Sequence, residues 1–523
     1  MALTKPNLKP KVVLVADRTL SAEYRILFEG IFATMQTSKV PEIAMRRFVS
    51  PKMSVDENGR AMAAPLGVRR VESALLQYTD LTADDIVCTT PEALESVLGP
   101  WVKIVGVSSS DPLGMGMSNT TTTSFWDGEL YTRRWTRQLL EKISTAKDKY
   151  NFTVVGGGAG AWQWQRYDDR VADDCIDIIF EGYFEEKGPQ LFRDILNGNR
   201  VDSYILENST AIDKVRPIVH PSMLGIIELS RGCGRGCRFC TMSDKKIGHA
   251  EPEIILSDLR TNVDAGIRSV VSGSEDFFRY GAVGLKPDFD KLYDLLVRMQ
   301  KIKGLSFMQI DHGNITSILQ HTDDQLREIR RLLTWEKKSD YLWVNMGAES
   351  ANGRLVADVC PGKIAPFDPD DWEDMIKEAA DKMTRTGFYS VFSLVLGLPG
   401  ETAADVQRTM KLVNWLEDKR AVIFPIFFEP LRQVDIAAGN KFSLEKLRPD
   451  HLALYSKCYE INFRKIPHLY WDNQRAGGVP WGVRVLTQML GKIETHDWRS
   501  KFKKIAKQLA AAEVNTEPEY VRL

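Results

Sequence analysis

The stretch Glu228–Thr241 reads ELSRGCGRGCRFCT and holds three of the chain's seven cysteines. Cys233, Cys237 and Cys240 follow a C-x3-C-x2-C spacing, directly after the apolar run 224–229. Iron–sulfur clusters are normally held by four cysteine thiolates, so three thiolates in one loop leave one iron open to a substrate. A structural zinc site usually has a second Cys or His pair, and this sequence offers no second Cys pair. The loop therefore predicts a [4Fe–4S] cluster, with a structural zinc or a reactive thiol cluster as the alternative.

An alternating series of apolar runs and helical patterns surrounds this loop. The expected strands are 224–229, 269–272, 306–310, 341–346, 390–396 and 421–427, and the expected helices between them are 252–265, 288–301, 323–333, 370–386 and 403–418. Strands that alternate with helices predict a parallel sheet of β/α units. Six units are too few for a conventional eight-stranded barrel, so we expect an open, partial (β/α)6 barrel over 216–430.

The flanking regions predict one further domain on each side. Before the barrel, the expected strands are 11–16, 101–108, 152–155 and 176–180, with helices over 22–35 and around 189–196. This pattern predicts a Rossmann-like parallel sheet over 1–215, with its ligand at the carboxyl ends of the strands. After the barrel, 444–463 and 483–511 read as helices, which predicts a small helical domain over 431–523. The fold class is α/β.

Composition restricts the class of protein further. The net charge is −1, from 69 basic and 70 acidic residues, without the basic surplus typical of nucleic-acid binders. No run approaches the roughly 20 apolar residues of a membrane span, and the polar stretch 1–11 has no apolar signal-peptide core. Seven cysteines are too few, and odd in number, for a disulfide framework. We expect a cytoplasmic protein with no membrane or nucleic-acid partner.

The cysteine loop also resembles a known family. Its C-x3-C-x-aromatic-C pattern, with Phe239 before the last cysteine, is similar to the radical S-adenosylmethionine (SAM) superfamily. Three later stretches fit in order at strand ends: SGSEDFF (272–278), GAES (347–350) and VLGLPGET (395–402). The resemblance implies that Glu275 and Asp276 bind the SAM amino group, that Glu349 and Ser350 lie near its ribose and carboxylate, and that Gly397 and Pro399 lie against its adenine.

The N-terminal strand ends resemble a second family. SSSDPLGMG (108–116), GGGAG (156–160) and EGYFEE (181–186), with PLG (65–67) upstream, are similar to the cobalamin-binding domains that precede many radical SAM domains. Small residues there would let a corrin approach the backbone. The implied contacts are Ser108, Ser109, Gly156, Gly157, Gly158, Glu181 and Gly182.

One feature of cobalamin proteins is missing from this domain. Many of them carry D-x-H-x-x-G, whose histidine binds cobalt from below, whereas no histidine precedes His220 in this chain. Cobalamin-dependent radical SAM methylases commonly lack this histidine too, so its absence favours that group. The alternative is a retained fold without a cofactor.

The two resemblances imply a cobalamin-dependent radical SAM C-methyltransferase. SAM would be cleaved to a 5′-deoxyadenosyl radical that removes a hydrogen atom from an unactivated carbon, and methylcobalamin would supply the methyl group. Because cofactors carry this chemistry, we nominate no general acid or base. The implied partners are an external electron donor, in an anaerobic setting, and a methyl acceptor. The acceptor is a protein side chain, such as a glutamine of methyl-coenzyme M reductase, or a small molecule.

Other functions remain open at this point. A radical SAM enzyme of small-molecule or lipid biosynthesis could do non-methylating chemistry beside a vestigial cobalamin domain. A non-catalytic cobalamin sensor or electron-transfer protein would not need the SAM motifs. Methylthiotransferases hold a second cluster on three N-terminal cysteines, but only Cys88 and Cys175 precede Cys233, which argues against that branch. Cys360 and Cys458 are expected to be buried and inert, with a hydrogen-donor or ligand role as the alternative.

Overall fold

The computed structural model describes residues 8–334, 342–431 and 441–516, with side chains described up to 511. Part of the polar N-terminal stretch and Tyr341, the first residue of an expected strand, lie outside the described residues.

Residue contacts divide the chain into two compact units. Unit 1 consists of Met1–Gly234, Thr241–Gly313 and Glu328–Lys338, and unit 2 consists of Arg235–Cys240, Asn314–Arg327 and Ser339–Leu523. The boundary between the units therefore passes through the cysteine loop. The three-domain division at 215 and 430 stays a prediction.

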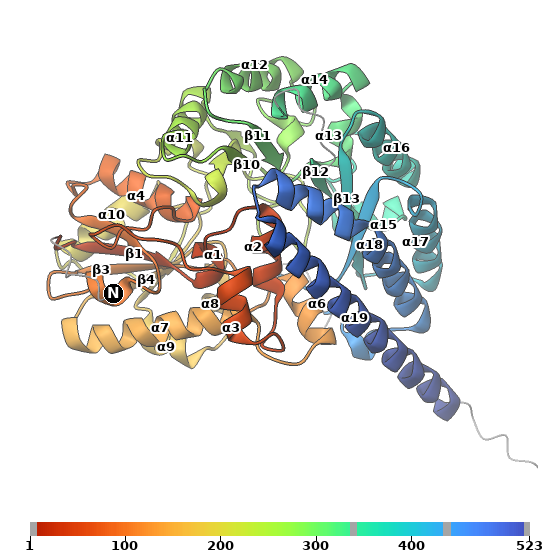
Figure 1. Cartoon of the computed structure of the whole chain (residues 1–523), viewed down its shortest axis with the longest axis horizontal. Helices are drawn as coiled ribbons and strands as arrows, with labels where there is room; N and C mark the ends of the chain where they lie inside the picture. Colours follow the sequence, from red (N-terminus) through yellow and green to blue (C-terminus); the bar gives the residue numbers. More distant parts are fainter. Residues whose placement is uncertain (1–7, 335–341, 432–440, 517–523) are drawn as a thin grey trace, which may run out of the picture. The chain divides into compact units, whose positions relative to one another are not determined.

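A six-stranded parallel sheet with the order β2-β1-β3-β4-β5-β6 forms the N-terminal part of unit 1 (Figure 1). The chain adds β2 on one side of β1 and then β3 on the other side, so the strand order reverses between β1 and β3. Open α/β sheets bind ligands at the carboxyl ends of the strands beside such a reversal. The expected parallel sheet is confirmed, although β2 and β6 were not predicted. The strands are β1 (Val12–Ala16), β2 (Ile86–Thr89), β3 (Ile104–Ser108), β4 (Thr153–Gly157), β5 (Ile178–Glu181) and β6 (Tyr204–Leu206).

Both faces of this sheet are covered by helices. Successive strand side chains point to opposite faces, so Val13 and Val15 enter one hydrophobic cluster with α7 and α9, while Val12 and Leu14 enter another with α4 and α10. Parallel sheets are normally buried on both faces in this way. The helices of this region are α1 (Arg18–Ser21), α2 (Leu27–Met35), α3 (Glu42–Ala44), α4 (Leu66–Tyr78), α5 (Leu94–Val97), α6 (Met117–Phe125), α7 (Tyr131–Tyr150), α8 (Ala161–Arg166), α9 (Arg170–Cys175) and α10 (Gly188–Leu196).

A three-stranded parallel sheet, β11-β10-β7, follows in unit 1. The strand expected over 224–229 is wrong in its first part, because Leu224 and Gly225 have φ angles of 56° and 59°, which extended strands do not adopt. Only Ile227 and Glu228 pair with β10. The elements here are β7 (Ile227–Glu228), β8 (Ser230–Arg231), β9 (Gly248–His249), β10 (Ser269–Gly273), β11 (Phe307–Ile310), α11 (Pro252–Asp264) and α12 (Phe289–Gln300).

Unit 2 is built on a second three-stranded parallel sheet, β12-β13-β14. The helix expected over 444–463 instead begins at Pro449, where a proline suits the first helical turn, and continues past Pro467 to Ala476. The elements are α13 (Ile315–Gln320), β12 (Trp343–Glu349), α15 (Gly353–Val359), α16 (Trp372–Arg385), β13 (Tyr389–Leu396), α17 (Ala403–Leu416), β14 (Ala421–Phe427), α18 (Pro449–Ala476) and α19 (Trp481–Thr516); α14 (Asp323–Leu333) spans the boundary between the units.

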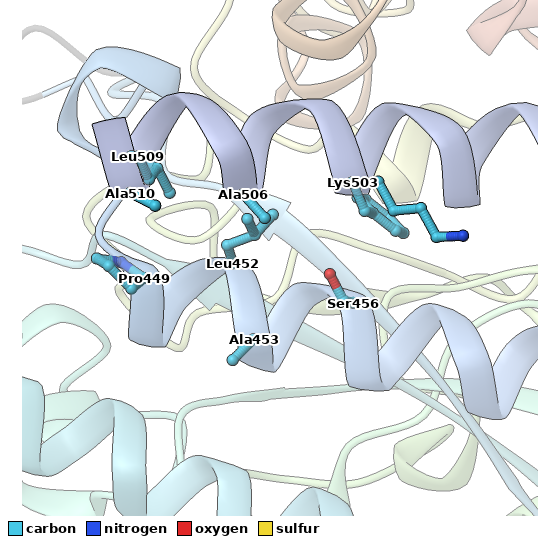
Figure 2. Close-up of a pocket in the computed structure, with 9 residues that line it drawn as sticks. Pro449, Leu452, Ala453, Ser456, Lys503, Ala506, Leu509 and Ala510 are labelled. Carbon is cyan, nitrogen blue, oxygen red and sulfur yellow. The ribbon is translucent and has the colours of Figure 1, made fainter. Parts of the chain in front are cut away.

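An open groove of about 390 Å³ runs between α18 and α19 (Figure 2). Its lining is mainly apolar and includes none of the residues expected to bind a cofactor. The lining residues are Pro449, Leu452, Ala453, Ser456, Phe502, Lys503, Ala506, Leu509 and Ala510.

The α/β fold class, with parallel sheets and a helical C-terminal region, is confirmed. Among the described helices, none combines the length and apolar character needed to cross a bilayer.

Candidate functional site

The first cysteine of the loop lies in unit 1 and is half-buried. The backbone N–H of Cys233 donates to Lys245 O at 2.9 Å, and its carbonyl accepts from Arg279 Nη2 at 2.8 Å. Gly232 has a φ of 73°, and a Cβ there would lie 2.6 Å from Lys245 O. The sequence therefore needs glycine at this position, and the backbone around Cys233 is held on both sides.

The other two cysteines, Cys237 and Cys240, lie in unit 2. Their part of the loop is fastened to the segment that follows α15. Arg238 N donates to Val359 O at 2.9 Å, and Gly362 N donates to Arg235 O at 2.8 Å. The buried Arg235 guanidinium returns a hydrogen bond to Gly362 O at 3.0 Å. This half of the loop is thus fixed by main-chain bonds to a segment more than a hundred residues away.

The surroundings of Cys237 favour its thiolate form. A hydrogen bond from the Cys360 thiol, helped by the charges of Lys363 and Arg235, lowers the pKa of Cys237 to about 7 against the effect of burial. Iron is bound by thiolates, not thiols, so this environment favours the ligating form. Cys360 is fully buried, as expected, and its thiol lies beside Cys237.

Cysteine thiolates are the ligands that iron–sulfur clusters require. Among the described residues, no three Cys, His, Asp or Glu side chains converge closely enough to hold one metal ion. A cubane offers a separate iron to each thiolate, so its ligands do not have to meet at a point. None of the seven cysteines, all of them described, forms a disulfide.

The residues expected to bind the SAM amino group lie after β10 in unit 1. The Glu275 side chain is exposed, whereas Asp276 is 1% exposed. Desolvation by the surrounding protein raises the pKa of Glu275; His312 opposes this rise, and the Asp311 and Asp276 carboxylates add to it. Glu275 is therefore an accessible carboxylate that an added cation would stabilise, while Asp276 belongs to the packed interior.

Glu349 and Ser350 lie at the end of β12 in unit 2. Glu349 has a φ of 60° at a register shift between β12 and β13, a strained conformation of the kind found at functional sites. Its carboxylate is ion-paired with Lys363. A Cβ on Gly347 would lie 2.3 Å from the charged atoms of both side chains. Ser350 is buried, with its Oγ 3.3 Å from Thr409 Oγ1.

The turn that holds Gly397 and Pro399 is fixed by the start of α18. Gly397 has a φ of 78°, and a Cβ there would lie 2.1 Å from the ring of Phe442. Glu401 accepts from Gly397 N at 2.8 Å and lies 2.8 Å from His451 Nε2. Pro399 is half-buried in the same turn.

The residues expected to contact cobalamin lie at the carboxyl edge of the six-stranded sheet. Most of them are buried or are required by the backbone conformation. Ser109 is fully buried, with its Oγ 3.2 Å from Thr136 Oγ1. Gly158 and Gly182 have φ angles of 95° and 120°, and Cβ atoms there would lie 2.6 Å and 2.2 Å from main-chain oxygens. Gly156 is buried against side chains.

Gly157 differs from its neighbours. It pairs with Ser108 across β4 and β3, is half-exposed, and has no positive φ. A Cβ there would meet nothing closer than 3.6 Å, the carbonyl of Phe180. A Cβ would make only ordinary van der Waals contacts here, so the fold does not require glycine at this position. Ser108 and Glu181, at the ends of β3 and β5, are also half-buried.

Asp111 organises the loop after β3 and was not predicted from the sequence. Its carboxylate accepts from Gly116 N at 3.0 Å and from Gln163 Nε2 at 2.5 Å, and it also accepts from Asn119 Nδ2. The signal was an aspartate in a D-P-L-G turn after a buried strand. This one side chain fixes the path of the loop at the sheet edge.

A buried ion-pair network was also missed, because its members are far apart in sequence. Arg231 binds both oxygens of Glu185 at 2.6 and 2.9 Å and donates to Glu228 at 2.8 Å. Arg70 donates to Glu228 at 3.2 Å and to Asp258 at 2.5 Å. Desolvation opposes ionisation of Glu228, but the two guanidiniums outweigh it and lower its pKa. Within unit 1, this network ties the six-stranded sheet to the strand that leads into Cys233.

Comparison with known proteins identifies a radical SAM domain. Residues 227–413 match the model of the radical SAM superfamily, which implies a [4Fe–4S] cluster and SAM. The ribosomal protein uS12 methylthiotransferase RimO of Leptospira biflexa is 25% identical over 325 residues, covering 56% of this chain and 62% of that protein. A tRNA-2-methylthio-N(6)-dimethylallyladenosine synthase of Shewanella denitrificans is 21% identical over 283 residues, 53% of this chain and 56% of that protein. The alignments thus span less than two thirds of these relatives.

The fold also resembles a solved structure over most of the chain. The radical SAM methyltransferase TsrM from Kitasatospora setae, with tryptophan and a SAM analogue bound, superimposes with a TM-score of 0.51 at 12% identity. The match covers 79% of this chain and 73% of TsrM. A second TsrM structure, with cobalamin and a [4Fe–4S] cluster bound, gives a TM-score of 0.51 at 13% identity. At this identity the likeness shows a shared fold.

Proposed function

We propose that this protein is a cobalamin-dependent radical SAM C-methyltransferase whose cluster is held by Cys233, Cys237 and Cys240. The observation that carries the proposal is that Gly157 is not required by the local packing, although it lies on the sheet edge where this fold class binds ligands. The strand order supports the same assignment, since the sheet reverses between β1 and β3. The second TsrM structure holds cobalamin and a [4Fe–4S] cluster, and the proposal extends both groups to this chain.

Each cofactor would supply one part of the chemistry. A cluster held by Cys233, Cys237 and Cys240 would supply the electron for cleavage of SAM to methionine and a 5′-deoxyadenosyl radical, and cobalamin would supply the methyl group. The protein would position these groups. Arg279 and Lys245 fix the backbone of Cys233, and the accessible Glu275 carboxylate offers an anionic partner to the SAM amino group. The half-buried turn with Gly397 and Pro399 would lie against the adenine.

The cysteines argue against the methylthiotransferase activity of the sequence relatives. Cys88 and Cys175 are the candidates for a second N-terminal cluster, but they belong to different hydrophobic clusters on opposite faces of the sheet. Burial raises the pKa of both thiols, that of Cys175 to about 11. Two inert thiols on opposite faces do not provide a cluster site.

The methyl acceptor belongs to one of two classes. A protein side chain, such as a glutamine of methyl-coenzyme M reductase, and a small molecule are both compatible with the proposed reaction. The tryptophan in the TsrM structure is an example of the second class. Assays with both classes of acceptor are needed to choose between them.

An anaerobic assay tests the proposal. The iron–sulfur-reconstituted protein is incubated with cobalamin, SAM and a strong reductant, and 5′-deoxyadenosine, S-adenosylhomocysteine and bound cobalamin are quantified. We expect both products and bound cobalamin. If 5′-deoxyadenosine forms without cobalamin binding, the function is non-methylating radical chemistry. If alanine substitutions of Cys233, Cys237 and Cys240 retain the cluster, the proposed ligands are wrong.

A further inference from the structure

The groove between α18 and α19 has the shape of a space that a third helix could fill. Both walls belong to unit 2, and their lining residues recur at the three- or four-residue intervals of one helix face. The lining covers 449–456 on α18 and 502–510 on α19. At 1.5 Å per residue, each row is about 10–12 Å long, which is about two helical turns. Figure 2 shows Leu452 of α18 and Ala506 of α19 pointing toward one another across the groove.

The lining offers few hydrogen bonds to an occupant. Apart from the Ser456 hydroxyl and the Lys503 ammonium group, every lining side chain is apolar. The walls are helical, so most of their main-chain N–H and C=O groups are already bonded within the helices. Burying an extended backbone there would leave its polar groups without partners, which is costly. A helix satisfies its own backbone groups and can present an apolar face to such a groove.

The α19 side of the groove carries positive charge that no nearby acid neutralises. Residues 499–511 contain five basic residues and no acidic residue. Lys503 lines the groove, and Lys507 lies one turn further along the same face of the helix. Both lysines are exposed, and neither forms an ion pair with any residue in the described part of the chain. On the α18 side, Asp450 is already paired with Arg448 at 3.0 Å.

We propose that this groove is a docking site for an acidic amphipathic helix of a partner protein. The apolar face of that helix packs between α18 and α19, and its flanking carboxylates lie against Lys503 and Lys507. The charge complementarity selects an acidic partner and rejects a basic one. Ala453, Ala506 and Ala510 in the lining have small side chains, which permit close approach of a third helix. The groove includes no residue assigned to a cofactor, so this inference does not depend on the proposed function.

Fluorescence anisotropy with labelled synthetic peptides and the full-length protein tests the proposal. The probe is an amphipathic peptide of about 15 residues, with leucines on one helical face and glutamates beside them. A second peptide has the same leucines and carries lysines in place of the glutamates. We expect the acidic peptide to bind about tenfold more tightly than the basic one, and its affinity to fall as salt is added.

Two pairs of variants separate the groove from the rest of α19. Lys503→Glu should reduce the preference for the acidic peptide by about tenfold, whereas Lys492→Glu makes the same change at an exposed position outside the lining and should retain it. Ala506→Trp fills the groove and should weaken binding of the acidic peptide, whereas Gln508→Trp, also exposed and outside the lining, should not. All four positions are exposed, so we expect each variant to fold.

Three results would overturn the proposal. The first is an acidic peptide that does not bind the wild type, or that binds Ala506→Trp equally well. The second is a variant without residues 517–523 that binds the acidic peptide far more tightly than the wild type, which would make the chain's own C-terminal segment the occupant. The third is a dimer in sedimentation velocity that Ala506→Trp abolishes, which would make a second copy of the chain the occupant.

Discussion

Arg231 binds two carboxylates at once in a nearly water-free place. Its side chain and that of Glu185 are each 2% exposed, and Glu228 is 13% exposed. A charge in such a place is tolerated only when it is paired and fully hydrogen-bonded. Removing one partner of this buried pair should therefore lower the free energy of unfolding far more than removing one partner of an exposed pair.

We predict that Arg231→Ala lowers the free energy of unfolding by about 3–5 kcal/mol, because it leaves Glu185 buried without its partner. Urea unfolding measures the change. The control is Arg170→Ala, which removes an ion pair whose side chains are 94% and 69% exposed and should have no measurable effect. Equal effects of the two substitutions would contradict the assigned role of the network.

Asp17 predicts a pH dependence. It caps α1 by accepting from Thr19 N at 2.8 Å, and burial raises its pKa from 3.8 to about 6. The folded state therefore binds the proton more tightly than the unfolded state. This residue's contribution to stability falls as the pH rises from about 4 to about 6. Above that range, the buried carboxylate costs up to about 3 kcal/mol.

Asp17→Asn keeps the cap and removes the charge. We expect its stability relative to the wild type to increase by up to about 3 kcal/mol between pH 4 and pH 8. The measurement is the difference between the two unfolding free energies at each pH, in which the other titrating groups cancel. A difference that does not change with pH would show that this carboxyl does not titrate as assigned.

At the scale of secondary structure, the apolar runs predicted most of the sheet strands. β10, β13 and β14 lie where they were expected, because each is a mostly buried run that follows a clear helical pattern. β2 and β6 are four and three residues long, too short for hydrophobic periodicity to distinguish from a loop.

The candidate site was predictable only in part. The cysteine loop and the strand-end motifs are local patterns, so sequence alone found them. Other contacts join segments far apart in sequence, so the spacing of residues along the chain cannot predict them. Examples are Arg231 with Glu185, and Cys360 with Cys237. Local patterns also could not tell that Ser109 and Ser350 are buried parts of the fold, because burial depends on packing.

Glycines in unit 2 give a prediction at this scale. Gly397→Ala places a Cβ 2.1 Å from the ring of Phe442, at a φ of 78°, and should destabilise the protein by about 2–4 kcal/mol. Gly491→Ala, within α19, meets no atom within 4 Å and should stabilise the helix by about 0.5–1 kcal/mol. Thermal unfolding of both variants tests the contrast. Two changes of the same sign would contradict it.

For the whole molecule, the proposed function requires that the N-terminal sheet and the radical SAM domain each hold a cofactor. Within unit 1 the two regions are tied by the Arg231 network, so a change in the sheet can alter stability as well as binding. A test of cobalamin binding therefore needs a substitution that leaves the fold intact. Most glycines at the sheet edge fail this requirement, since a Cβ there would meet the main chain.

Gly157→Val meets the requirement. Its Cβ would lie 3.6 Å from the nearest atom, a normal contact, and valine suits the end of a strand. We predict a folded protein with more than tenfold weaker cobalamin binding, because the new side chain would enter the region proposed for the corrin. Equilibrium dialysis with hydroxocobalamin measures the affinity, and the rise in melting temperature on adding cobalamin should disappear. Gly482→Val, at a position with no neighbour within 4 Å, is the control. A folded Gly157→Val variant that binds cobalamin as the wild type does would mean that the corrin lies elsewhere or that the domain holds none.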